Sequence, residues 1–181
     1  MKAQYRATVC MAVLILLASV TIALASEDVV DALKARYPLS RIEVQNVAVQ
    51  ERVAKQGARL RLQADGLPAK AFRVTQVNTK SPRFHVRDYA RFEVASGHPV
   101  TLEPGELILQ KGTEVVVLDL KVQANVVRMF THTSEPISTF SGRPVYGCTE
   151  FVFRFDGLSL EPADAARVQQ VIERWLSPTS S

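Results

Sequence analysis

Apolar residues at every second position predict β-strands along most of this chain between residues 41 and 156. The run 148–155 is the clearest case: threonine and phenylalanine occupy its odd positions, whereas Cys148, Glu150, Val152 and Arg154 occupy its even ones. A strand with this alternation buries one face and leaves the other to polar side chains. Strands are predicted over 42–46, 59–63, 71–77, 83–94, 107–110, 113–123, 126–133 and 149–155.

Helical spacing appears only near the two ends of this β region. We predict one helix over 27–37, which Pro38 ends, and an amphipathic helix over 161–176. A polar stretch over 133–147 is interpreted as a loop. The predicted fold class is α+β and mostly β: a small antiparallel sheet, SH3-like or barrel-like, with an N-terminal and a C-terminal helix packed on it.

Residues 1–25 have the pattern of an export signal. Lys2 and Arg6 precede an uncharged apolar run that ends on Ala23-Leu24-Ala25, the small-x-small pattern that a signal peptidase cuts. We expect cleavage before Ser26 and a periplasmic or extracellular protein with a single globular domain over 26–181. The alternative is an uncleaved signal that anchors the protein, because the apolar run is close to the short limit for a membrane span.

Cysteine usage fits this compartment without a disulfide. Cys10 lies within the predicted signal, so Cys148 is left as the one cysteine of the exported chain. Free cysteine behaves as a small buried hydrophobe in most folds, and we interpret Cys148 in that way. The alternative is a small secreted hydrolase or thiol enzyme in which Cys148 is the nucleophile, His132 the base, and Glu150 or Asp119 orients the histidine.

Positive charge is concentrated in one block of an otherwise balanced chain. The formal net charge is +4, but residues 52–91 carry ten basic against two acidic side chains, a net charge of +8. In the predicted strand 83–94, five side chains that suit an anionic ligand share one face. These candidate binding residues are Arg83, His85, Arg87, Tyr89 and Arg91.

Phosphate, sulfate or carboxylate groups match the geometry of arginine, so anionic lipid, lipopolysaccharide or an acidic glycan are the expected partners. Another envelope protein is a further option, and nucleic acid does not suit the compartment. The simpler interpretation is a solvated face whose basic side chains pair with acidic ones elsewhere in the chain. The acidic residues named for this role are Glu103, Glu106, Glu114 and Glu135.

From about residue 108 to 176 the chain resembles a known group of proteins. The run 111–122, its returning strand, the phenylalanine strand and the helix with Val168, Val171 and Ile172 resemble the C-terminal part of small exported bacterial proteins, often from Acidobacteria, that have no assigned activity. The resemblance implies an exported β-domain closed by a helix, and it carries over no catalytic residue.

Motifs for cofactor or metal chemistry are not found in the sequence. The three histidines show no paired spacing, and neither a glycine-rich phosphate loop nor a nucleophile elbow occurs. Within the predicted loop 133–147, Arg143 and Tyr146 are the candidates for a functional surface. We therefore expect a non-catalytic binding or assembly module of the bacterial envelope that needs no cofactor.

Overall fold

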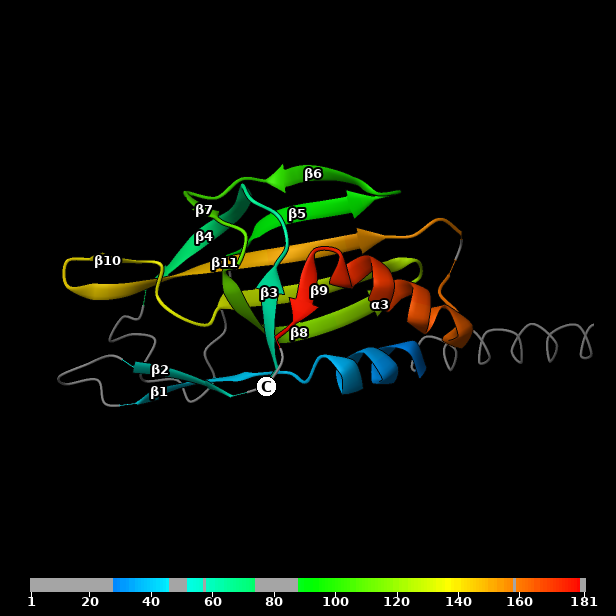
Figure 1. Cartoon of the computed structure of the whole chain (residues 1–181), viewed down its shortest axis with the longest axis horizontal. Coiled ribbons are helices and arrows are strands. Elements are labelled where there is room, and N and C mark those ends of the chain that lie inside the picture. Colours follow the sequence, from blue (N-terminus) through cyan, green and yellow to red (C-terminus); the bar gives the residue numbers. More distant parts are fainter. Residues whose placement is uncertain (1–27, 46–51, 57, 74–87, 158, 180–181) are drawn as a thin grey trace, which may run out of the picture.

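One long strand, β11 (Arg143–Arg154), forms the centre of a curled, mixed sheet that resembles half of a barrel (Figure 1). The computed structural model describes residues 28–45, 52–56, 58–73, 88–157 and 159–179. A helix over 28–36 precedes the sheet, and η1 (Pro162–Asp164) and α3 (Ala165–Glu173) follow it. The other strands are β1 (Arg41–Gln45), β2 (Arg52–Gln56), β3 (Arg59–Leu62), β4 (Leu67–Arg73), β5 (Ala90–Ala95), β6 (His98–Glu103), β7 (Leu107–Leu109), β8 (Glu114–Gln123), β9 (Val126–Thr133), β10 (Ser138–Phe140) and β12 (Leu176–Pro178).

β11 has different neighbours along its two edges. On one edge it pairs with β10 and then with β9, and the sheet continues through β8 and β3 to β12. On the other edge Val145–Cys148 is antiparallel to β4, whereas Thr149–Arg154 is parallel to β5. The prediction of a mostly β fold with a curled sheet and two helices is confirmed. The purely antiparallel sheet is wrong, because β5 and β11 run in the same direction.

The predicted alternation in burial is confirmed in β5, whereas β11 is buried on both faces from Val145 to Phe153 rather than on one. Phe151 and Phe153 are fully buried, and Phe92 and Val94 of β5 lie in the same core. The core also takes in both helices and the inner faces of β3, β8 and β9. Its members include Val29, Leu33, Tyr37, Leu60, Leu62, Val117, Leu120, Val127, Met129, Val168, Ile172 and Leu176.

Both helices cover the same face of the sheet (Figure 1). Arg36 donates a hydrogen bond of 2.7 Å from Nη2 to Glu173, which joins the helix 28–36 to α3. The Trp175 ring meets Phe92 edge-on, with the ring centroids 5.2 Å apart. The face of β5, β11, β9 and β8 that points away from these helices is called the outer face below, and it carries the polar members of each alternation.

Several predicted element boundaries are wrong. The helix expected over 161–176 ends at Glu173, because Leu176 begins β12 and pairs with Leu62 on the edge of β3. The stretch 98–103, for which no strand is predicted, is β6.

The expected loop 133–147 contains β10 and the start of β11, which Ser141 and Gly142 join with φ angles of 51° and 74°. These two positive φ angles define a tight hairpin turn that matches the twist of the strands. Arg143 is therefore an exposed hairpin residue. Tyr146 is buried in β11 with 3% of its surface exposed, so it is not part of a loop surface.

Candidate functional site

Three charged side chains meet on the outer face at the junction of β5, β11 and β9. Alternation along β11 turns Glu150 to the outer face because its neighbours Thr149 and Phe151 point to the other side. Arg91 lies directly opposite Glu150 on β5, and Arg128 lies opposite Val152 on β9. The two arginines therefore stand on either side of β11, about 10 Å apart by the spacing of strands.

Glu150 holds both arginines through the same type of nitrogen. Its Oε2 accepts a hydrogen bond of 2.9 Å from Nε of Arg91, and its Oε1 accepts one of 2.5 Å from Nε of Arg128. Only 3% of the Glu150 side chain is exposed. Burial raises the pKa of this carboxyl, but the hydrogen bonds from Arg128 and Arg91 outweigh burial, so the net pKa lies below its ordinary value. Glu150 is therefore ionised at neutral pH.

The outer ends of the two arginines remain available. Among the described residues, no hydrogen bond involves a terminal Nη nitrogen of Arg91 or Arg128. The exposed fractions of these two side chains are 40% and 31%. Together with Glu150, they form a group of net charge +1 that we call the anchored arginine pair.

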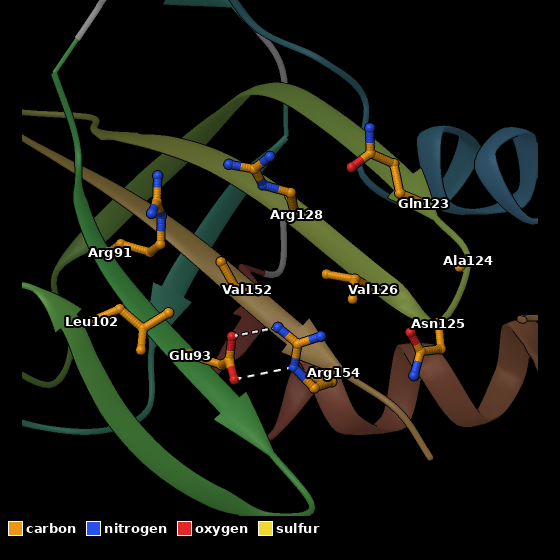
Figure 2. Close-up of a pocket in the computed structure, with 10 residues that line it drawn as sticks. All are labelled: Arg91, Glu93, Leu102, Gln123, Ala124, Asn125, Val126, Arg128, Val152 and Arg154. Carbon is orange, nitrogen blue, oxygen red and sulfur yellow. Dashed lines mark hydrogen bonds and ion pairs between the residues drawn. The ribbon is translucent and has the colours of Figure 1, made fainter. Parts of the chain in front are cut away.

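The anchored arginine pair lies beside a cleft of about 420 Å³, which we call the arginine cleft (Figure 2). Arg154 lies in this cleft and forms an ion pair with Glu93 of the neighbouring β5, with donors Nε and Nη2 at 3.2 and 3.0 Å. The side chains in Figure 2 surround an open space above Val152. The lining residues are Arg91, Glu93, Leu102, Gln123, Ala124, Asn125, Val126, Arg128, Val152 and Arg154.

An aromatic cluster lies next to Arg128 on the outer face. The Phe130 ring has Arg128 at 5.5 Å and Lys121 at 5.2 Å from its centroid, and Tyr89 packs against it edge-on at 5.2 Å. Burial raises the pKa of the Tyr89 hydroxyl, which is therefore neutral at physiological pH. The Phe130 ring is thus covered by cations, and its contact with Arg128 adds to the rigidity of that side chain.

Cys148 and His132 face each other across β11 and β9, as direct partners in the strand register. Both are fully buried. The His132 ring packs against Phe72 and Tyr146, with centroids 5.1 and 5.0 Å apart. Glu150, one of the two orienting groups of the thiol-enzyme alternative, is two residues from Cys148, but its carboxylate oxygens are hydrogen-bonded to the arginines. The cysteine and histidine of the thiol-enzyme alternative are therefore adjacent, but neither is open to a substrate.

The structure describes only part of the binding face that the sequence predicts. Tyr89 and Arg91 are on the outer face, as predicted, whereas Arg83, His85 and Arg87 lie outside the described residues. Sequence reasoning missed the contribution of Arg128 and Arg154, together with Glu93, Gln123 and Asn125. The short β8–β9 turn is the sequence feature that could have located Arg128, because a short turn fixes the register between the two strands that it joins. The pairing of β9 with β11 then brings Arg128 next to Glu150.

Part of the basic block does pair with acidic side chains, as the simpler interpretation states. Glu114 forms ion pairs with Arg59 and Arg61, at 3.4 and 3.1 Å, and Glu103 pairs with Lys70 at 3.6 Å. All these pairs are at least partly exposed, so each contributes little to stability. Glu106 and Glu135 form no ion pair with the described residues. Arg91, in contrast, pairs with the buried carboxylate of Glu150.

No group of three or more histidine, cysteine, aspartate or glutamate side chains among the described residues is placed to hold a metal ion. No described helix is long and apolar enough to cross a membrane, and the predicted signal at 1–25 lies outside the described residues.

Comparison of the chain with protein-family models, with curated proteins and with solved structures finds no match.

Proposed function

We propose that the protein is an exported, non-catalytic binding module of the bacterial envelope and that it binds an anionic ligand in the arginine cleft. One observation carries this proposal: the buried Glu150 holds Arg91 and Arg128 by their Nε atoms, and both arginine side chains line an open cleft. A guanidinium group held in this way retains the donors that match a carboxylate or phosphate.

The anchored arginine pair differs from an ordinary structural ion pair in its charge balance. One arginine would neutralise Glu150, so the second leaves an excess positive charge on the outer face. Holding both side chains before a ligand arrives reduces the conformational entropy that binding would otherwise cost. The contact of Arg128 with Phe130 restrains that side chain further. Both features support ligand binding rather than stability as the role of the pair.

The exported location supports the class of ligand. Residues 1–25 predict secretion to the periplasm or the outside, where anionic lipid, lipopolysaccharide and acidic glycans are the anions within reach. The cleft lies on the curled half-barrel sheet. That this sheet is SH3-like or barrel-like, as the sequence predicts, remains part of the proposal. The thiol-enzyme alternative is not favoured, because Cys148 and His132 are fully buried.

The proposal is tested by binding to a panel of anions. The full gene is expressed in a bacterial host, and the exported product is titrated with phosphatidylglycerol vesicles, lipopolysaccharide and polygalacturonate at low and high salt. The double variant Arg91→Gln with Arg128→Gln removes two positive charges next to the cleft. We expect the wild type to bind at least one of the three, with an affinity that salt weakens, and the double variant to lose this binding.

Two control variants make the result specific. Arg174→Ala removes an exposed arginine at the end of α3 that does not line the cleft. This variant should bind like the wild type. Arg83→Ala with Arg87→Ala tests the remainder of the face predicted from sequence. Binding that survives in the Arg91 and Arg128 variant but disappears in the Arg83 and Arg87 variant would move the site away from the arginine cleft. Equal binding by all variants, or none by any, would refute the proposed function.

A further inference from the structure

The chemistry of the arginine cleft narrows the class of ligand, provided that the proposed function is correct. Five charged groups belong to the cleft and its support: three arginines, with Glu93 and Glu150 as the two carboxylates. The net charge of these groups is +1. A site with this balance complements a ligand unit that carries one negative charge better than it complements a dianion such as a phosphate monoester.

The rest of the lining suits a ligand with several hydroxyl groups. Gln123 at the end of β8 and Asn125 in the β8–β9 turn bring amide groups to one end of the cleft (Figure 2). The amide nitrogen of Asn125 already donates to the Phe155 carbonyl, which leaves the amide oxygen of Asn125 for a ligand. Glu93 lies on the opposite wall and adds carboxylate oxygens. Amides and carboxylates together both donate and accept hydrogen bonds, as a hydroxyl group requires.

The apolar part of the lining is aliphatic. Val126, Val152 and Leu102 line the cleft, and none of its lining residues is aromatic. A nucleobase would need an aromatic surface for stacking, which these residues do not supply. Aliphatic side chains suit the C–H groups of a saturated ring instead.

The rim of the outer face adds no net positive charge for an anionic bilayer. Asp119 pairs with Lys121 on β8 at 3.3 Å, and Glu103 of β6 pairs with Lys70 at 3.6 Å. These two pairs are neutral, so the attraction for a flat anionic membrane is limited to the small charge of the cleft itself. A cleft of about 420 Å³ is also the size of a small-molecule site rather than of a lipid surface.

We infer that the arginine cleft binds an acidic glycan, one uronic-acid unit at a time, through the sugar carboxylate and the sugar hydroxyl groups. The carboxylate lies between the Nη atoms of Arg91 and Arg128, above Val152. The hydroxyl groups meet Gln123, Asn125 and Glu93, and the ring lies against the aliphatic side chains. The wet, polar character of such a site gives a modest affinity for a single unit, which a polymer raises by offering many units.

Calorimetric titration with trigalacturonic acid tests this inference on the exported product. Its fully methyl-esterified form is the matched control ligand, since esterification removes the negative charges and leaves the ring hydroxyls in place. We expect the acid to bind and the ester to bind at least ten-fold more weakly. Gln123→Ala should weaken binding of the acid about three- to ten-fold, as expected for one hydrogen bond.

Tripolyphosphate and phosphatidylglycerol vesicles separate the ligand class from the general site. Gln123→Ala keeps both arginines, so a ligand that uses charge alone should bind it as well as the wild type. If vesicles or tripolyphosphate bind through Arg91 and Arg128 while trigalacturonic acid does not, the glycan inference is overturned and the proposed function stands. If no probe binds, or if Arg91→Gln with Arg128→Gln leaves all binding unchanged, both are overturned. Binding of trigalacturonic acid that is unchanged in Arg91→Lys with Arg128→Lys overturns the glycan inference alone. Arg→Lys variants keep the charge opposite Glu150, so they test the guanidinium geometry in a folded protein.

Discussion

Replacing Glu150 by glutamine tests the structural account of the outer face most directly. The substitution keeps the size of the side chain but removes the negative charge that faces Arg91 and Arg128. A hydrogen bond to a charged group contributes about 1.5–3 kcal/mol, and two such bonds are lost or weakened here. The arginines are 40% and 31% exposed, so water recovers part of this loss. We expect Glu150→Gln to lower the free energy of unfolding by about 2–3 kcal/mol.

Glu93→Gln is the matched control for this change. Glu93 pairs with Arg154, whose side chain is 48% exposed, so the same substitution there should cost at most about 1 kcal/mol. Urea unfolding is followed through the fluorescence of Trp175, the single tryptophan, which packs against Phe92 in the core. Typical domains have about 5–15 kcal/mol of stability, so both variants should remain folded.

The pH dependence supplies an independent readout. The pKa of Glu150 is lowered in the folded protein, so its contribution to stability is complete above the ordinary carboxyl pKa of about 4.3. That contribution is lost as the pH falls through the lower, folded-state pKa, where the wild type becomes protonated at Glu150. The difference between wild type and Glu150→Gln should therefore shrink below about pH 4. Equal costs for Glu150→Gln and Glu93→Gln, or a difference that persists in strong acid, would refute the reasoning.

Four further predictions concern the backbone, the thiol and the leader. A Cβ added at Gly105 would lie 2.0 Å from the carbonyl oxygen of Ala69, so Gly105→Ala should cost more than about 3 kcal/mol in thermal unfolding; an unchanged melting temperature would contradict the close packing. Ala124 has a φ of 50°, so Ala124→Gly should stabilise the protein by about 0.5–1 kcal/mol, and a loss of stability in urea would show that the turn is not strained. Cys148→Ser should cost only about 1 kcal/mol and leave anion binding intact; loss of binding by a folded variant would give the thiol a functional role. Mass spectrometry of the exported product should place its first residue at Ser26, whereas recovery of the intact leader on membranes would indicate an anchor.

The strands that alternation marks most strongly are the ones that the sequence locates well. Phe151 and Phe153 point into the core as predicted, because a period of two is a local property of the chain. The parallel pairing of β5 with β11 is not local, so no pattern within either strand predicts it. Alternation also places Glu150 on the correct face of β11, but the two arginines that it binds lie on two other strands. The site therefore depends on register, which a single sequence leaves open.

The missed hairpin at β10 and β11 has a different cause. Pro144 and Gly142 are typical of loops, so the stretch around them predicts a loop rather than two strands joined by a turn. Ser141-Gly142 followed by the continuous run to Arg154 was the available signal, since a glycine at that place permits a two-residue turn. Strand β6 was missed for a similar reason, because Pro99 lies inside it on the edge of the sheet.

The pairing of β12 with β3 has a consequence for the order of events when the chain is made. Thr179 donates a backbone hydrogen bond to Arg59, and these residues are 120 positions apart in sequence. At a synthesis rate of about 5–20 residues per second, roughly 6–24 s pass between the appearance of the two partners. During that time the edge of β3 has no β12 and the core lacks α3. Contacts of such long range also make folding slow. The core therefore cannot close until residues 165–179 have been made, and the export that we propose from residues 1–25 requires a chain that is still open.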